Sequence, residues 1–339
     1  RVPELMATID RTGEPLLRVE DLQTYFYTRT GVVKAVDGIT FDLHPGETLG
    51  IVGESGSGKS MTAWSILGLV PQPAGKIVGG KIIFKGQNLL EASEAEMRAI
   101  RGSGISMVMQ DPLTSLNPVF TIGSQVIESL RMENKGSMAK LKTMAAELLA
   151  KVSIPSPETR LTAYPHEMSG GMRQRVVGAI AISRFPSVLI ADEPTTSLDA
   201  TVQLQYLKLL KEIQENTGAA IIFITHDLGI VANMCDRVGV MYAGKFVEQA
   251  PVQPLFDNPA HPYTEALMRS VPDLEVDVDH LPSIDGQPPS PDDLPPGCAF
   301  APRCEYAFDK CEVYPDVFKI GENHTAACWR HSGEYASNN

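Results

Sequence analysis

The sequence predicts an α/β fold with a largely parallel sheet at its core. An apolar strand at 48–52 is followed by a glycine-rich loop and a helix at 61–69, which is the beginning of a β-loop-α unit. Strands that alternate with helices form parallel sheets because the helix returns the chain to the same edge. Further apolar strands alternate with a helix at 201–215, and they lie at 188–191, 221–225 and 238–242.

The other segments predict additions to this core. Residues 16–42 hold short alternating apolar runs between Thr-Gly and Asp-Gly turn signals, which indicates antiparallel strands. Between 122 and 152 the apolar spacing becomes helical. We expect a flexible N-terminus at 1–15, in which Arg1–Leu5, before Met6, are interpreted as a tag remnant. One large domain follows at 16–272, with a helical subdomain at about 113–184. A Pro/Asp-rich linker at 273–297 then leads to a Cys-rich extension at 298–339.

The charge and hydropathy of the chain exclude some function classes. With 29 basic and 41 acidic residues, the net charge is 29 − 41 = −12, which argues against binding nucleic acid through its phosphates. The sequence contains no run of about 20 apolar residues, the length that spans a bilayer. The chain is therefore expected not to cross a membrane itself.

Residues 53–60 read Gly-Glu-Ser-Gly-Ser-Gly-Lys-Ser and match the phosphate-loop pattern G-x-x-x-x-G-K-[ST]. Backbone N–H groups of such a loop surround phosphate oxygens, Lys59 reaches the β- and γ-phosphates, and the Ser60 hydroxyl binds Mg²⁺. A plain glycine-rich turn is the alternative, but the flanking strand and helix favour the phosphate loop. The residues expected at the ATP phosphates are Gly53, Glu54, Ser55, Gly56, Ser57, Gly58, Lys59, Ser60 and Met61.

A second part of the nucleotide site is predicted at the end of the apolar strand 188–191. Two carboxylates, Asp192 and Glu193, follow this strand. Asp192 is expected to hold Mg²⁺ through water, and Glu193 to act as general base on the attacking water. Such a pair alone often only caps the next element, and the phosphate loop is what makes the nucleotide interpretation strong.

Residues 168–175 read Met-Ser-Gly-Gly-Met-Arg-Gln-Arg at the start of a predicted helix. Ser169 as N-cap, followed by Gly170 and Gly171, exposes backbone N–H groups at a positive helix end. A flexible turn is the alternative. The segment resembles the signature of ATP-binding cassette (ABC) ATPases, usually Leu-Ser-Gly-Gly-Gln, with Met168 and Met172 replacing Leu and Gln. The resemblance covers about 16–272 and includes Gln110 after a strand, Ser197-Leu198-Asp199 after Glu193, and His226 after the strand 221–225.

The chain is thus identified as a member of the ABC ATPases. This resemblance implies a P-loop NTPase fold with a RecA-like parallel sheet core, an N-terminal antiparallel β subdomain and a helical signature subdomain. It implies catalytic roles for Gln110 and His226 beside Glu193, with Gln110 also binding Mg²⁺. A satisfied core histidine is the alternative for His226. Adenine is expected to stack on Phe26, with Tyr25 and Tyr27 as neighbouring candidates, and Ser169, Gly170, Gly171 and Asp199 are expected to meet the ATP of a partner subunit.

Two segments, 110–118 and 261–267, resemble the ATP-binding subunits of bacterial dipeptide and oligopeptide importers. The resemblance implies an ATP-hydrolysing subunit that powers peptide import through closure and opening of a cassette dimer. It also implies two transmembrane permease subunits, a second and non-identical ABC ATPase subunit, and an extracytoplasmic peptide-binding protein. Contact with the membrane would be through the permeases only, at the cytoplasmic face of the bacterial inner membrane. The exact substrate stays open between dipeptides, oligopeptides, nickel and related solutes.

Four of the five cysteines lie beyond residue 297, and Cys235 is expected to be a buried apolar side chain. The four lack the close Cys pair usual in zinc sites, and disulfides are disfavoured for an ATPase of reducing cytosol. Peptide-importer ATPases have the same tail, which resembles a [4Fe-4S] site. Zinc and unligated cysteines are the alternatives, as is a soluble ATPase of iron-sulfur assembly or redox function. His324 is a substitute ligand if one cysteine does not bind. The expected cluster ligands are Cys298, Cys304, Cys311 and Cys328.

Overall fold

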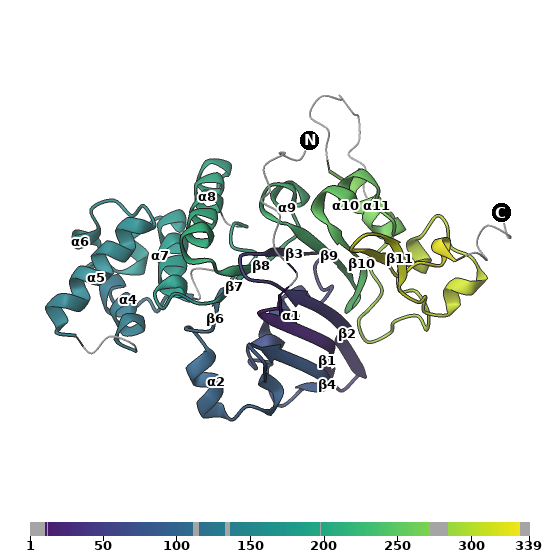
Figure 1. Cartoon of the computed structure of the whole chain (residues 1–339), viewed down its shortest axis with the longest axis horizontal. Coiled ribbons are helices and arrows are strands. Elements are labelled where there is room, and N and C mark those ends of the chain that lie inside the picture. The colour runs from purple at the N-terminus through teal and green to yellow at the C-terminus, as the bar shows by residue number, and fades with distance from the viewer. Residues whose placement is uncertain are drawn as a thin grey trace. The chain divides into compact units, whose positions relative to one another are not determined.

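The computed structural model describes residues 11, 13–110, 115–132, 136–196, 198–271 and 284–332. The chain divides into two compact units, which are considered separately below (Figure 1). The first unit comprises Arg1–His44, Thr48–Glu91 and Ile224–Asn339, and the second comprises Pro45–Glu47 and Ala92–Phe223.

An antiparallel sheet of four strands, in the order β2-β1-β4-β5, forms one part of the first unit. Figure 1 labels the first three of these strands, which lie side by side. On β1 the side chains of Leu17, Val19 and Leu22 are fully buried. The spacing of three between Val19 and Leu22 keeps both on the core side because the register shifts between them, where Asp21 has a φ of 46°. The antiparallel strands predicted over 16–42 are confirmed as β1 and β2, whereas β4 and β5 lie beyond the predicted range. The bounds are β1 (Leu17–Tyr27), β2 (Val32–Leu43), β4 (Gly75–Phe84) and β5 (Gln87–Asn88).

The first unit also holds a mixed sheet. In it β3 pairs in parallel with β9, and β10, β12 and β11 continue in antiparallel order. The last two strands come from the Cys-rich tail, whose apolar pattern predicts no strand. They have four and three residues, too few to show a period, and they pair because β10 offers an edge. The bounds are β3 (Thr48–Val52), β9 (Arg237–Tyr242), β10 (Lys245–Pro251), β11 (Phe318–Gly321) and β12 (His324–Ala326).

Short helices complete the first unit. The helix α1 begins at Lys59, directly after the predicted phosphate loop. The helix α11 begins after His261, whose Nδ1 accepts a 3.0 Å hydrogen bond from the backbone N–H of Tyr263. The helices are α1 (Lys59–Ile66), α9 (Leu228–Met234), α10 (Val252–Asp257) and α11 (Pro262–Arg269), with the single turns η1 (Leu89–Glu91), η3 (Ala301–Arg303), η4 (Asp309–Glu312) and η5 (Trp329–His331).

The second unit is mainly helical, with β6 and β7 paired in parallel. On α4 the side chains of Ile122, Val126 and Leu130 are buried, and their spacing of four places them on one face. The helical spacing predicted between 122 and 152 corresponds to α4 and α5. The elements are α2 (Glu94–Ile100), β6 (Ile105–Val108), α4 (Ile122–Arg131), α5 (Met138–Lys151), α6 (Pro157–Arg160), η2 (Pro165–Glu167), α7 (Gly170–Ile182), β7 (Val188–Asp192) and α8 (Ala200–Thr217).

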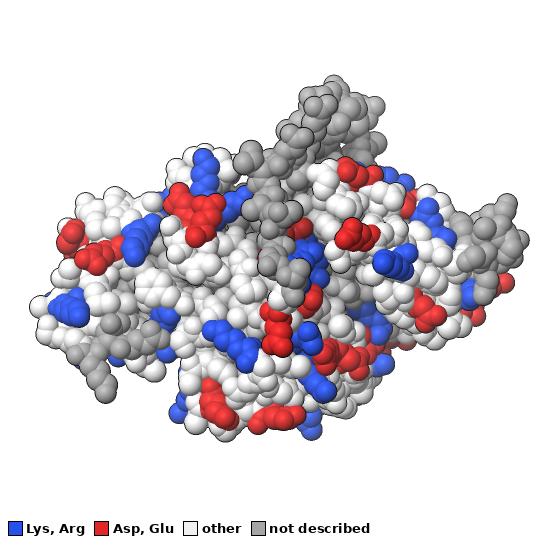
Figure 2. All heavy atoms as spheres, viewed as in Figure 1, with Lys and Arg blue, Asp and Glu red and all other residues white. Residues whose placement is uncertain are grey.

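The strand β8 (Ala220–Thr225) is buried along its whole length and passes from the second unit into the first. None of the helices in the described parts of the chain is long and apolar enough to cross a membrane. On the face drawn in Figure 2, acidic and basic side chains are interspersed over the described surface.

Candidate functional site

The predicted phosphate loop joins β3 to α1 in the first unit. The buried ammonium of Lys59 donates hydrogen bonds to the backbone carbonyls of Gly53 (2.7 Å) and Glu54 (2.9 Å). Gly58 has a φ of 107°, and a Cβ at this position would lie 2.2 Å from the carbonyl oxygen of Ala35. Only glycine fits here, because both the backbone conformation and the space exclude a side chain. The loop thus combines a closely packed turn, a cation and a following helix N-terminus, the features that bind phosphate.

Ser60 and Met61 lie in the first turn of α1 and are half-buried. Phe26, the residue predicted to stack on adenine, lies on β1 of the same unit and is also half-buried. Of its neighbours, Tyr25 is engaged in a 2.5 Å hydrogen bond to the carboxylate of Asp37, whereas Tyr27 is exposed. The Tyr25 hydroxyl is therefore bound to Asp37 within the sheet.

The two carboxylates after the second predicted motif are placed by β7 in the second unit. The side chain of Asp192 is buried at the strand end. Glu193 follows with a φ of 44°, and its Oε2 accepts hydrogen bonds from the side-chain amide of Gln110 (2.9 Å) and the hydroxyl of Thr196 (3.1 Å). Gln110 and Glu193, predicted from separate motifs, are thus brought into direct contact. Asp111 to Thr114, which follow Gln110 in the importer-like segment, lie outside the described residues.

The predicted signature segment forms the start of α7. The Ser169 hydroxyl accepts a 3.3 Å hydrogen bond from the backbone N–H of Met172, as an N-cap does. A Cβ on Gly171 would approach Cγ1 of Val202 on α8 to 2.8 Å, whereas a Cβ on Gly170 would meet nothing within 4 Å. Gly171 therefore allows α7 and α8 to approach closely, and Gly170 leaves the helix end open.

Asp199 caps α8 and accepts a 3.0 Å hydrogen bond from the backbone N–H of Val202. Ser197 lies outside the described residues. His226 is exposed directly after β8. The predicted site residues are thus divided between the units: the phosphate loop, Phe26 and His226 belong to the first, and the others named above belong to the second.

All four tail cysteines line one pocket in the first unit. All five cysteines of the chain are among the described residues, and none forms a disulfide. Burial, with a further contribution from the neighbouring thiols, raises the pKa of Cys298 to about 11 and the pKa of Cys328 to about 12. Within the described residues, no group of three or more His, Cys, Asp or Glu side chains is arranged to hold one metal ion.

His324 and Cys235 lie apart from the thiol pocket. The Nε2 of buried His324 is 2.8 Å from Oε1 of Glu248, which also accepts from the backbone N–H of Ala260. The side chain of His324 therefore links β12 to β10 through this contact with Glu248. Cys235 is fully buried beside Gly50, as predicted for an apolar side chain.

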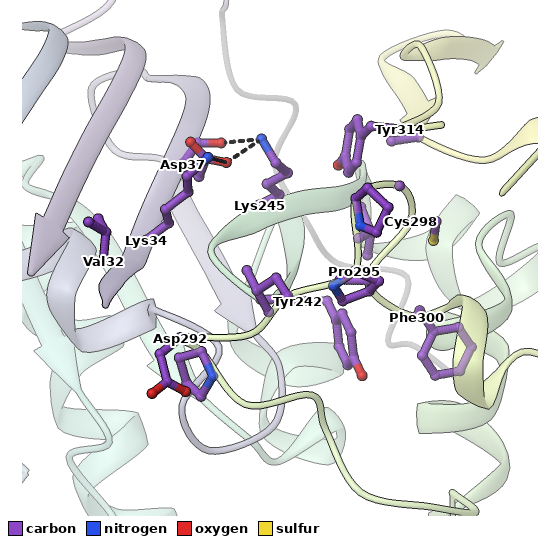
Figure 3. Close-up of a pocket in the computed structure, with 18 residues that line it drawn as sticks. Val32, Lys34, Asp37, Tyr242, Lys245, Asp292, Pro295, Cys298, Phe300 and Tyr314 are labelled. Atoms are coloured by element: carbon purple, nitrogen blue, oxygen red, sulfur yellow. Dashed lines mark hydrogen bonds and ion pairs between the residues drawn. The ribbon is translucent and has the colours of Figure 1, made fainter. Parts of the chain in front are cut away.

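A neighbouring pocket lies where the tail meets β2, β9 and β10 (Figure 3). Asp37 and Lys245 form an ion pair of 2.9 Å at one side, and Cys298 and Phe300 of the tail lie at the other. The Phe300 ring packs on Tyr242, with ring centroids 5.4 Å apart. The tail thus packs against strands β2, β9 and β10 of the same unit.

Two residues at the phosphate loop were not found from the sequence. The Tyr263 hydroxyl accepts a 2.8 Å hydrogen bond from the backbone N–H of Glu54, and Arg303 pairs with the Glu54 carboxylate at 2.7 Å. These residues lie 209 and 249 positions beyond Glu54, so no local sequence pattern predicts their contacts with it.

Comparisons with known proteins agree with these motifs. Residues 36–196 match the family described as "ABC transporter", and residues 247–311 match "Oligopeptide/dipeptide transporter, C-terminal region". The probable peptide ABC transporter ATP-binding protein y4tR of Sinorhizobium fredii is 52% identical over 93% of this chain and 95% of its own length. The dipeptide transport ATP-binding protein DppD of Bacillus subtilis is 49% identical over the same shares. The chain belongs to the peptide ABC transporter ATP-binding proteins.

Solved structures show the same cassette fold as this peptide ABC transporter ATP-binding protein. The cbiO1 protein of Clostridium perfringens, part of the ABC transporter complex cbiONQ, matches with a TM-score of 0.62 at 29% identity, covering 73% of this chain and 92% of its own. The dimeric bacterial ABC transporter cassette MJ0796 has a TM-score of 0.63 at 24% identity, covering 70% and 98%. The predicted α/β fold of an ABC ATPase is confirmed, and the chain is an ATPase of this class.

Proposed function

We propose that this chain hydrolyses ATP to power the import of short peptides. The observation that carries this proposal is the identity of about half of all residues to peptide and dipeptide transport ATP-binding proteins over 93% of the chain. The match of residues 247–311 to the oligopeptide/dipeptide transporter C-terminal region supports it, because this region lies beyond the general ABC match.

At the ATP site, residues 53–61 bind the phosphates and Phe26 stacks on adenine. Glu193 accepts the proton of the attacking water, and the hydrogen bond from Gln110 supports this role because it orients the carboxylate. Ser60, Gln110 and Asp192 would hold Mg²⁺, which would screen the negative charge of the phosphates. His226 contacts the γ-phosphate. Ser169, Gly170, Gly171 and Asp199 approach the ATP held by the partner cassette, where the backbone N–H groups at the start of α7 favour an anion.

The proposed assembly contains two permease subunits, a second and non-identical ABC ATPase subunit, and an extracytoplasmic peptide-binding protein. ATP closes the two cassettes around two nucleotides, and hydrolysis opens them again. The chain lies at the cytoplasmic face of the bacterial inner membrane and contacts it through the permeases. We assign residues 16–272 to the nucleotide-binding domain, with its helical subdomain at about 113–184, followed by the linker 273–297 and the extension 298–339.

We further propose a [4Fe-4S] cluster in the tail. The convergence of its four thiols on one pocket supports this ligand set. Among the described residues no group of three or more His, Cys, Asp or Glu side chains is arranged to hold one metal ion, so the proposal rests on the pocket that the four thiols share. Burial raises the pKa of Cys298 and Cys328, so near neutral pH these thiols keep their protons unless metal binding displaces them. A bound cluster would supply metal–thiolate bonds that cross-link the tail.

Mass spectrometry of the intact complex from native membrane tests the importer assignment. We expect two permeases, a second ATPase and a peptide-binding protein. A soluble ATPase of iron-sulfur assembly is the competing function, and recovery of the chain without membrane subunits, together with cluster transfer to an apo-acceptor, would establish it instead.

Anaerobic purification followed by iron, sulfide and zinc analysis tests the cluster. We expect about four irons and four sulfides per chain. Replacement of Cys304 by Ser should lower the iron content, whereas replacement of the buried Cys235 by Ala should leave it unchanged. Stoichiometric zinc without sulfide would overturn the cluster assignment.

A further inference from the structure

Arg303 connects the tail to the phosphate loop within the first unit. Its guanidinium makes a two-pronged pair with the Glu54 carboxylate, with Nη1–Oε2 at 2.7 Å and Nη2–Oε1 at 3.0 Å. Only 4% of the Arg303 side chain is exposed. Its remaining N–H groups donate to the Tyr242 hydroxyl (3.2 Å) and to the backbone carbonyls of Asp285 (3.0 Å) and Ile284 (3.4 Å). A buried guanidinium with all its donors used is held in one orientation.

The backbone of Glu54 is also held, by Tyr263. The fully buried Tyr263 accepts the Glu54 N–H through its hydroxyl at 2.8 Å. The Tyr263 ring packs on Tyr242 and on Phe300 of the tail, with centroids 4.6 and 5.3 Å apart. Both the main chain and the side chain of Glu54 are therefore fixed by residues far downstream of the loop.

The charge of Glu54 gives this arrangement a consequence for nucleotide binding. Glu54 lines the same pocket as Ser55, Gly56 and Ser57 of the phosphate loop. A carboxylate in a loop that binds a polyphosphate repels its ligand unless a cation compensates it. Arg303 supplies that cation, and its short two-pronged contact also holds the carboxylate in one orientation.

We propose that Arg303 is a positioning residue for ATP binding, which neutralises and orients Glu54 from the tail. This inference rests on the ATP site proposed above. It connects the Cys-rich tail to the nucleotide site, because Arg303 is the last residue of the turn η3, which lies between Phe300 and Cys304. The tail then acts on ATP affinity through the loop, without touching the nucleotide.

ATP titration of the purified full-length chain tests this proposal. Arg303→Met should raise the Kd for ATP about tenfold at low ionic strength, and 0.5 M salt should reduce this effect, because the uncompensated carboxylate is screened. The informative variant is Glu54→Gln combined with Arg303→Met. It should bind ATP more tightly than Arg303→Met alone, because the repelling charge is gone. A merely structural role of Arg303 predicts no such rescue.

Two further variants keep the experiment decisive. Arg303→Lys keeps the charge but loses the two-pronged contact, so it should raise the Kd by about threefold, and it replaces Arg303→Met in the test if that variant fails to fold. Arg269→Met removes a different tail ion pair, the exposed 2.5 Å contact with Glu305, and should leave the Kd unchanged. An unchanged Kd in Arg303→Met, or no rescue by Glu54→Gln, overturns the inference. Absence of ATP binding by the wild-type chain would instead contradict the proposed function.

Discussion

The side-chain amide of Gln110 donates a 2.9 Å hydrogen bond to the carboxylate of Glu193, 83 residues further along the chain. Glu193 has a φ of 44°, a left-handed conformation that costs a non-glycine residue roughly 1–2 kcal/mol. Such a conformation persists because the surrounding structure holds it, and it is concentrated at functional sites. The contact therefore links two motifs of the proposed ATP site through one oriented carboxylate.

Replacement of Glu193 by Gln should abolish hydrolysis but preserve ATP binding. The amide is nearly isosteric but cannot accept a proton, and general-base catalysis contributes about 10²–10⁴-fold to the rate. Phosphate release and equilibrium ATP binding measure the two effects, and size-exclusion chromatography should show more closed dimer. Glu215→Gln, on the exposed end of α8, is the matched control. Wild-type turnover in Glu193→Gln would remove Glu193 as the base.

Replacement of Ser169 by Asp should separate folding from hydrolysis. Asp is as good an N-cap as Ser, so α7 should keep its stability, and Ser169→Ala should lose about 1 kcal/mol. The new carboxylate would repel the γ-phosphate of the partner subunit, so we expect hydrolysis to fall at least tenfold. Thermal unfolding and phosphate release in the assembled complex check both effects. Normal hydrolysis by Ser169→Asp would contradict the contact with the partner ATP.

The adjacent glycines of the signature should respond differently to Ala. Gly171→Ala places a Cβ 2.8 Å from Val202, so it should lower the free energy of unfolding by about 1–3 kcal/mol. Gly170→Ala meets nothing within 4 Å and should be neutral or stabilising by up to about 1 kcal/mol. Urea unfolding measures the stability of both variants. A second substitution, Val202→Ala, should restore the stability that Gly171→Ala loses. Equal stabilities of the two single variants would contradict this packing role.

Asp37 should make stability depend on acid pH. Burial raises the pKa of its carboxyl, but hydrogen bonds from Tyr25 and Lys245 outweigh burial and hold this pKa below its usual value. The contribution of Asp37 to unfolding free energy is therefore complete above the unfolded pKa of about 3.9 and is lost as the pH falls through the lower folded pKa.

Asp37→Asn should accordingly cost about 1–3 kcal/mol at pH 7 and progressively less below pH 4. Urea unfolding of both proteins between pH 2.5 and 7 measures the difference. Glu20→Gln, at an exposed 3.9 Å pair with Arg18, should show little change. A constant difference between wild type and Asp37→Asn over this range would contradict the assigned pKa direction.

The tail shows where prediction from sequence ended. Its four cysteines line one pocket, and the ligand site that the sequence predicts there stays a prediction. Its two short strands were not predicted, because three or four residues carry no readable period. The partner of His324 was also hidden, since Glu248 lies 76 residues away on another strand.

The sequence by itself determined the elements whose chemistry is contiguous: the loop at 53–60, the carboxylates after β7, and the helix start at Ser169. These are readable because backbone geometry over a few residues places the necessary groups together. The tertiary structure alone decided which distant side chains meet them. Gln110 reaches Glu193, and Tyr263 and Arg303 hold Glu54, because strand pairing and ring packing bring remote segments together. Pairing over such separations depends on the register of the whole fold, which no local pattern encodes.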